Sequence, residues 1–166
     1  VPAAGDAFNT AAILTLTAAH LAHDIYSAFL APLLPVLISR LGIPLAAAGV
    51  LPSAFKLGSL AQPFLGLWAD RSDARWFVIA TPTATALCMS MLGLAPNYLA
   101  VLVLVTMGGI SHAAFHPAAA ATVTRASGHT WGRGTSLYMT GGKLGFAIGP
   151  IFIVSILTWF GQERSY

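Results

Sequence analysis

Five long apolar runs divide the sequence, and each is long enough to cross a lipid bilayer. They occupy residues 10–39, 45–68, 76–94, 98–123 and 135–160, with short polar breaks between them. About 20 apolar residues span the hydrocarbon core as a helix, and a helix satisfies its own backbone hydrogen bonds there. Only 8% of the residues are charged, whereas a soluble domain carries about 25%. The sequence therefore predicts an all-α integral membrane protein with five transmembrane helices.

The arginines of the connecting segments predict the orientation in the membrane, because basic residues collect on the cytoplasmic side. Four fall on one side and two on the other: Arg71, Arg75, Arg125 and Arg133 against Arg40 and Arg164. This difference places the amino terminus in the cytoplasm, and we expect a bacterial inner membrane. Because the arginines are spread over several loops, the net charge of +3 does not indicate a nucleic-acid partner.

Seven titratable side chains interrupt the apolar runs: His20, His23, Asp24, Lys56, His112, His116 and Lys143. A lone membrane histidine is often only a hydrogen bond between helices, and a lone lysine can extend to the membrane surface. A charge at the bilayer centre costs roughly 2.5–3.5 kcal/mol, so Asp24, Lys56 and Lys143 together cost about 9 kcal/mol. Such groups normally face a protein interior or a wet cavity. We interpret the set as a pathway for substrate or protons.

The spacing of the histidines predicts that they share a helix face. His20, His23 and Asp24 stand at positions i, i+3 and i+4 of the first run. His112 and His116 stand at i and i+4 of the fourth run. Residues three and four apart are neighbours on one helical surface. We expect the two faces to line a central cavity together.

Two pairs of segments indicate an internal repeat. Residues 56–64 read KLGSLAQPF and residues 143–151 read KLGFAIGPI, so each has Lys-Leu-Gly, four residues and then proline. Residues 20–24 and 112–116 both begin with histidine and carry Asp or His four positions later. Transporters are often built from three-helix units of inverted topology, with the substrate site near the membrane midplane. The repeat also predicts a sixth helix, which the sequence does not contain.

The connection GLWADRSDAR resembles the loop between the second and third helices of the major facilitator superfamily. Four of its residues match that motif: Gly66, Asp70, Arg71 and Arg75. Asp73 and Ala74 stand where the family has a glycine and a basic residue. The resemblance implies that Asp70 and Arg71 belong to a cytoplasmic charge network that steadies one conformation.

Within that superfamily, the sequence resembles the fosmidomycin-resistance-like exporters. The similarity lies in His20 and the Asp24-Ile25-Tyr26 sequence, in Phe115-His116-Pro117, and in the segment GGKLGFAIGP. It covers only the amino-terminal half of a twelve-helix protein. It therefore implies that residues 1–166 are helices one to five of a six-helix half-bundle, with the sixth helix and the carboxy-terminal half absent. We accordingly expect a partial molecule, completed by a missing half, a second copy or a partner chain.

The fifth run resembles part of a motif associated with antiporters, and it departs from that motif at Lys143. The residues in question are Gly141, Gly145, Gly149 and Pro150. Glycines that recur every four residues let a second helix backbone approach closely. The stripe therefore predicts helix packing. Lys143 lies two positions from it, about 200° around the helix, and is predicted to face a different neighbour.

The two lysines favour an anionic cargo. At an effective dielectric of 20, a lysine about 8 Å away repels a unit cation by roughly 2 kcal/mol and attracts an anion equally. The resemblance implies alternating access. We therefore expect a secondary active transporter that exports a small organic anion or drug-like solute, with Asp24 or a histidine as proton carrier. Neither an enzyme activity nor a cofactor is expected.

Two alternatives stay open from the sequence. His20, Asp24, His112 and His116 could bind a transition metal as the ion or chelate that is transported. More remotely, the histidines could ligate haem in a membrane redox protein.

Overall fold

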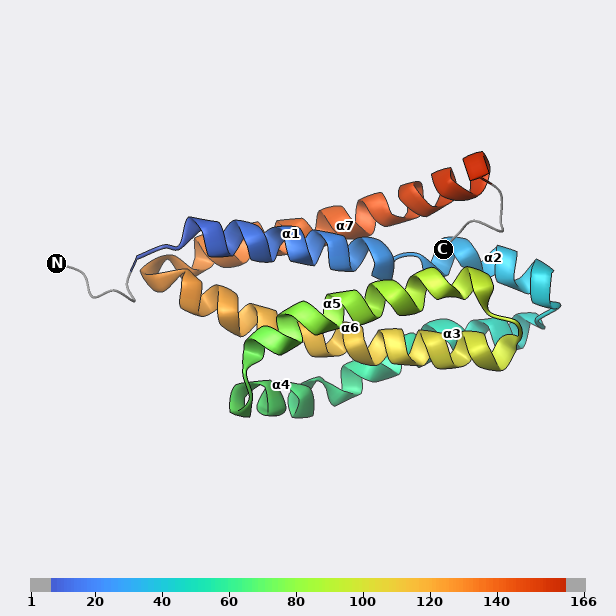
Figure 1. Ribbon diagram of the computed structural model, residues 1–166, viewed down its shortest axis with the longest axis horizontal. Coiled ribbons are helices and arrows are strands. Elements are labelled where there is room, and N and C mark those ends of the chain that lie inside the picture. The colour runs from blue at the N-terminus through green and yellow to red at the C-terminus, as the bar shows by residue number, and fades with distance from the viewer. Residues whose placement is uncertain (1–6, 161–166) are drawn as a thin grey trace.

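The computed structural model describes residues 7–160, and within them every regular element is helical. The elements are α1 (Thr10–Ser27), α2 (Leu30–Leu41), α3 (Leu45–Leu57), η1 (Gly58–Ala61), α4 (Gln62–Arg71), α5 (Ala74–Ser90), η2 (Met91–Leu94), α6 (Tyr98–Ala126), η3 (Gly128–Thr130) and α7 (Trp131–Phe160). They form an elongated helical bundle (Figure 1). The predicted all-α half-bundle is confirmed. Arg164, which contributes to the predicted charge bias, lies outside the described residues.

Four helical stretches are long and apolar enough to cross a membrane: Thr10–Leu41, Ala74–Leu94, Tyr98–Ala126 and Gly128–Phe160. The predicted helix at residues 45–68 is not among them, and it is divided into α3, η1 and α4. The first predicted helix is likewise divided between α1 and α2.

A proline follows each of these breaks. Pro32 has no N–H to donate to the carbonyl of Ala28, and Pro63 has none to donate to that of Ser59. Each break therefore falls where one helical hydrogen bond is missing in any case.

The chain direction is that of an inverted repeat. Figure 1 shows α1 and α6 running in opposite directions, and the same holds for α3 and α7. These are the helices that the His and Lys-Leu-Gly matches pair in the sequence. Their opposite directions are those that inverted repeats require.

The core consists of two apolar clusters with a polar layer between them. One cluster includes Leu33, Leu51 and Val105, and the other includes Ile13 and Val123. Along α1 and α6, residues 20–24 and residue 112 lie between these clusters. The titratable residues are thus held in the middle of the bundle by apolar packing on both sides.

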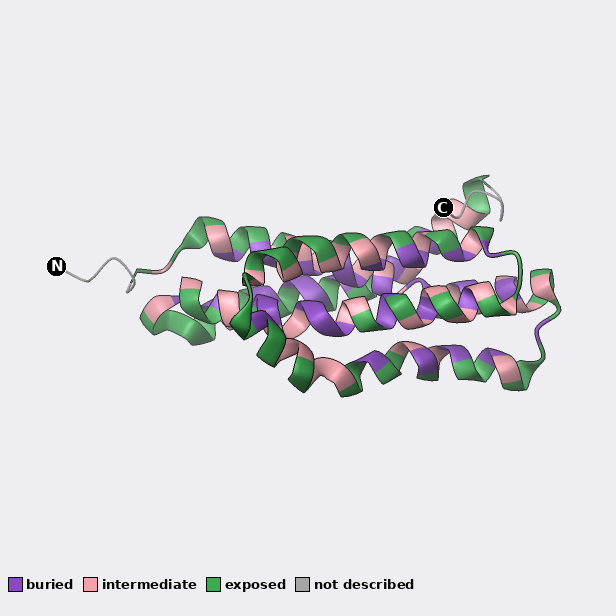
Figure 2. Cartoon of the chain, turned by 60° about the horizontal axis from the view of Figure 1, so that its bottom comes forward, coloured by how far each residue is buried: buried purple, intermediate pink, exposed green. Residues whose placement is uncertain are grey.

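The outer surface of the bundle is apolar. Figure 2 shows buried residues on the helix faces that meet and exposed residues outside. Leu45 and Trp159 are 80% and 79% exposed. A soluble protein rarely leaves so many large apolar side chains uncovered, whereas a bilayer solvates them.

Backbone contact joins α7 to α1. A Cβ atom added at Gly145 would lie 2.5 Å from the carbonyl oxygen of Leu21, and one at Gly149 would lie 2.5 Å from that of Ile25. A Cβ at Gly141 would overlap the carbonyl oxygen of Thr17. The glycines therefore face three successive turns of α1, which brings Tyr138 and Gly142 beside the histidines.

Candidate functional site

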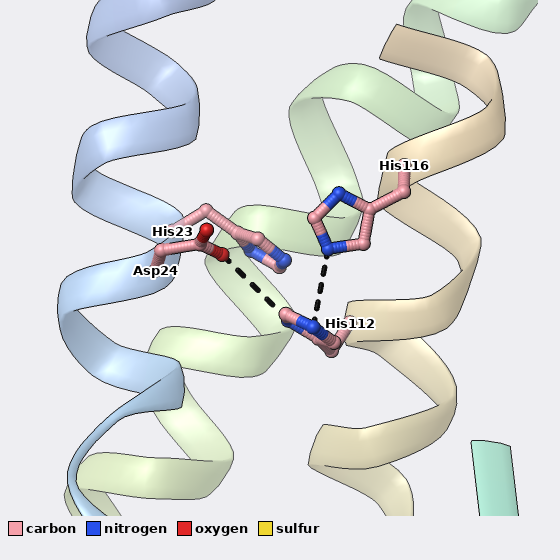
Figure 3. A group of neighbouring side chains, drawn as sticks. All are labelled: His23, Asp24, His112 and His116. Atoms are coloured by element: carbon pink, nitrogen blue, oxygen red, sulfur yellow. Dashed lines mark hydrogen bonds and ion pairs between the residues drawn. The ribbon is translucent and has the colours of Figure 1, made fainter. Parts of the chain in front are cut away.

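Helices α1 and α6 bring five titratable side chains to one place: His20, His23, Asp24, His112 and His116. Figure 3 shows four of them converging between the two helices. His20, His23 and Asp24 are only 3%, 1% and 2% exposed, whereas His112 and His116 are partly buried. The helical spacing on each side places these residues on the facing surfaces.

His20 is held between two oxygen atoms. Its Nδ1 lies 2.9 Å from the backbone carbonyl oxygen of Tyr138, which can only accept, so Nδ1 carries a hydrogen and donates. Its Nε2 lies 3.1 Å from Oδ2 of Asp24. A bare nitrogen beside a carboxylate would be repulsive, so this geometry places one proton between Nε2 and Oδ2. The His20–Asp24 pair is therefore electrically neutral overall, which suits its burial.

Ser27 orients the ring of His112. The Ser27 hydroxyl donates to the carbonyl oxygen of His23 at 2.9 Å, so its oxygen is left to accept. The Nδ1 of His112 lies 2.9 Å from that oxygen and therefore donates to it. The Nε2 of His112 then bears a lone pair, which accepts a hydrogen bond from Nε2 of His116 at 3.1 Å.

His23 and Asp24 retain unused polar atoms in the same place. Within residues 7–160, neither ring nitrogen of His23 has a hydrogen-bond partner, nor has Oδ1 of Asp24. The His23 ring is stacked on that of His112 at 4.9 Å between centroids and also packs on Phe115 at 4.4 Å. Each buried unsatisfied polar group costs about 1–3 kcal/mol, so these atoms need an explanation beyond packing.

Two cavities border this cluster, and each has a lysine in its lining. The larger, of about 610 Å³, is lined by Lys56, Ser59 and His112, among others. The smaller, of about 260 Å³, is lined by Lys143 with His20, Asp24, His116 and Gly142. Phe146 borders both cavities. Within residues 7–160 neither lysine forms an ion pair with a carboxylate.

Gly142 is a site residue that the sequence did not single out. A Cβ atom there would lie 2.5 Å from Nε2 of His20 and 2.8 Å from Oδ2 of Asp24. The absence of a side chain at 142 therefore leaves room for the His20–Asp24 pair. The double glycine at 141–142 is the only sequence signal for this position, because the stripe of every fourth residue includes Gly141 and not Gly142.

Of the four loop-motif residues, Asp70, Arg71 and Arg75 lie at the junction of α4 and α5, whereas Gly66 lies within α4, where a Cβ would be 3.4 Å from Cβ of Pro117. Asp70 and Arg75 line a hollow of about 500 Å³ together with Arg125 of α6. Asp73, which departs from the family motif, caps α5 by accepting from the backbone N–H of Arg75 at 3.0 Å. Among the described residues the loop makes no ion pair.

A sequence profile of the Major Facilitator Superfamily matches residues 16–165. The chain belongs to this superfamily. The match includes every titratable residue of the cluster and both lysines, so the cluster lies inside a Major Facilitator Superfamily transmembrane domain.

Curated relatives within the Major Facilitator Superfamily extend the comparison. The chain is 27% identical to the fosmidomycin resistance protein of Escherichia coli strain K12 over 97% of this chain and 42% of the relative. It is 26% identical to the uncharacterized MFS-type transporter YfnC of Bacillus subtilis, over 86% of this chain and 35% of the relative. It is 27% identical to the multidrug resistance protein MdtG of Salmonella paratyphi A, over 72% of this chain and 31% of the relative.

The resemblance to the fosmidomycin-resistance group, predicted from the motifs, is thus confirmed. The chain spans less than half the length of each of these relatives. No solved structure matches the chain significantly.

Proposed function

We propose that the protein is part of a secondary active transporter that exports a small organic anion or drug-like solute in exchange for protons. One observation carries the proposal: a cluster of titratable groups borders two cavities, and each cavity has a lysine in its lining. Intramembrane ionisable groups beside a cavity mark transport pathways. Two of the relatives bear names of resistance to fosmidomycin or to several drugs, and this supports outward transport.

The lysines set the expected charge of the substrate. Each is exposed to its cavity without a carboxylate partner among the described residues. An anion about 8 Å from one ammonium group gains roughly 2 kcal/mol at an effective dielectric of 20. The apolar residues around Lys56, including Phe55 and Phe146, would accept the carbon skeleton of such a solute.

The His20–Asp24 pair is the expected carrier of the coupling proton. It holds one proton between Nε2 and Oδ2, and both residues border the cavity that contains Lys143. Entry of an anionic substrate and release of this proton would then occur within one cavity.

A second helical half is expected to close the pathway. The two cavities lie at the surface of the described helices, and the chain spans 42% of the E. coli relative. The second half would come from a longer chain, from a second copy or from a partner chain.

Fosmidomycin resistance provides the test. The full protein, expressed in a drug-sensitive bacterium, should raise the tolerated concentration of fosmidomycin, and a protonophore should restore drug accumulation. Asp24→Asn keeps the shape of the side chain but removes its charge, and it should abolish resistance. His129→Gln removes the one histidine outside the cluster and is the matched control. Membrane-inserted Asp24→Asn with full resistance would contradict the proposed pathway, and wild-type protein without resistance would contradict this substrate.

A second candidate cargo is a transition metal ion or its chelate. The close grouping of imidazole nitrogens with a carboxylate oxygen in the cluster favours it. Uptake or export of radioactive zinc by the same cells would distinguish this cargo from fosmidomycin.

A further inference from the structure

We propose that His23, Asp24, His112 and His116 form a buried binding site for a divalent first-row transition metal ion such as Zn²⁺. Each residue offers one ligand atom, and the four atoms lie within 4.8 Å of one another. Figure 3 shows the four side chains directed toward a common centre. The proposal rests on these donor atoms, and the site shares Asp24 with the proton carrier proposed above.

The set of ligands differs from the one that the sequence suggested. The sequence pointed to His20, but its two ring nitrogens are already engaged by the carbonyl of Tyr138 and by Asp24. His23 takes its place, because it is 1% exposed and neither of its ring nitrogens has a hydrogen-bond partner within residues 7–160. A bound metal would satisfy one of these nitrogens and remove a cost of about 1–3 kcal/mol.

Asp24 can serve the metal and His20 at the same time. Its Oδ2 contacts His20, whereas its Oδ1 has no hydrogen-bond partner among the described residues and lies 3.9 Å from Nδ1 of His112. Oδ1 is therefore the free ligand atom. A carboxylate ligand that is itself hydrogen-bonded is a regular feature of metal sites, because the outer contact fixes its orientation.

The hydrogen bonds of His112 prepare it for coordination. Its Nδ1 donates to Ser27, whose own hydrogen is bound by the carbonyl of His23. Metal-ligating histidines almost always donate their second N–H in this way, and the tautomer leaves Nε2 free to bind. Ser27 thus acts as an outer partner of the site.

The distance between two of the nitrogens fits tetrahedral coordination. Nε2 of His112 lies 3.1 Å from Nε2 of His116. Two nitrogens bound at 2.0–2.1 Å to one tetrahedral ion are separated by about 3.3 Å. A metal ion can therefore replace the hydrogen that these two atoms share with little change in their separation, once each ring turns its lone pair toward the ion. The other donors must approach by somewhat more, since the group spans up to 4.8 Å.

The chemistry of the donors selects the class of metal. Three imidazoles and one carboxylate suit Zn²⁺ and its first-row neighbours, whereas Ca²⁺ and Mg²⁺ prefer oxygen ligands. All four ligands come from α1 and α6. The site is therefore complete within this half-bundle, in contrast to the cavities.

Metal titration of the full protein in lipid nanodiscs tests the proposal. Zn²⁺ should bind with one ion per chain in calorimetry, and Co²⁺ in its place should give the intense visible absorption of tetrahedral coordination. Excess Mg²⁺ should not compete. Displacement of Zn²⁺ by Mg²⁺, or octahedral Co²⁺ absorption, would overturn the assignment.

Substituting two histidines of α1 distinguishes the proposed metal ligand, His23, from His20, which contacts the ligand Asp24 but is not proposed to bind the metal. His23→Gln should weaken Zn²⁺ binding by more than about 100-fold, and His20→Gln by about tenfold, since an outer partner costs about 10–100-fold. His129→Gln should bind as the wild type does. Equal effects of His23→Gln and His20→Gln would refute the proposed ligand set.

His116→Gln tests the site without replacing a fully buried residue. His116 is only partly buried, so this variant is expected to fold. It should also lose more than about 100-fold in affinity. Unchanged Zn²⁺ binding in a folded His116→Gln protein would overturn the site, whatever the behaviour of the other variants.

Discussion

The two segments that carry the Lys-Leu-Gly motif fold differently. In α7 the motif lies within one continuous helix of 30 residues, which runs through Pro150. In the other copy the chain is divided into α3, the four-residue turn η1 and α4. Both copies have a proline five residues after the motif glycine. Proline alone therefore does not decide whether the helix continues.

Both segments pack closely on a neighbouring helix. α7 meets the backbone of α1 over three successive turns, at Gly141, Gly145 and Gly149. The other copy packs on α6 along α3, η1 and α4, and its backbone comes closest where a Cβ at Gly58 would overlap the carbonyl of Gly109. The extent of packing therefore does not separate the two copies, which differ in the helix that each one contacts.

The largest expected effect concerns the two motif glycines. Gly145→Val would force a side chain against the carbonyl of Leu21 and Cβ of Asp24, which a Cβ would approach to 2.5 and 2.9 Å. Overpacking costs about 1–3 kcal/mol, and we expect about 3 kcal/mol, because the neighbouring contacts prevent α7 from shifting. Gly58→Val should cost a similar amount, because a Cβ there would meet the backbone of Gly109 and Ile110. Reversible unfolding in mixed micelles measures both.

Gly132→Ala is the control for this pair, because nothing lies within 4 Å of a Cβ added there. It should leave the free energy of unfolding within about 0.5 kcal/mol of the wild-type value. A loss below about 1 kcal/mol for either valine variant would show that its helix can shift away from its neighbour.

Substituting either motif lysine should have a smaller effect, and the effect should be similar for the two lysines. Lys56→Met and Lys143→Met each remove one positive charge from a cavity. Each should raise the KM for an anionic substrate about tenfold, which corresponds to about 1.4 kcal/mol. Lys→Arg at either position should preserve the KM. Transport assays in everted vesicles decide this, and an effect at only one position would assign substrate to one cavity.

The smallest effect is expected for the two prolines. Pro63→Ala restores an N–H that could donate to the carbonyl of Ser59, yet the crossing at Gly58 should keep η1 in place. The stability should therefore change by less than about 1 kcal/mol, and amide exchange at residues 58–61 should stay fast. Pro150→Ala should add protection within α7. Slow exchange throughout residues 58–61 in Pro63→Ala would show that proline, not packing, divides this segment.

Much of the fold could be predicted because membrane helices are recognisable in a sequence as long apolar runs. The predicted run at 98–123 corresponds to α6, Tyr98–Ala126, and the run at 135–160 to α7, Trp131–Phe160. The breaks after Ser27 and Leu57 could not be predicted, since prolines at other positions lie inside intact helices. What divides a helix here depends on contacts made across the bundle.

The candidate site was predictable in its members but not in their roles. Helical spacing indicates that His112 and His116 share a face, and so do His20 and His23. Which histidine on α1 keeps free nitrogens depends on the carbonyl of Tyr138, 118 positions away from His20. Every residue has a backbone carbonyl, so the sequence does not indicate which one accepts this hydrogen bond. The same holds for Gly142, whose importance lies in the space that it leaves empty.

The glycine contacts couple α1 and α7 mechanically. Backbones that touch over three turns have no long side chains between them to yield, so a force on one helix passes directly to the other. The hydrogen bond from His20 to Tyr138 ties the same two helices at the level of the cluster. A backbone movement of α1 at His20 and Asp24 would therefore carry α7 with it, and Lys143 would move together with α7.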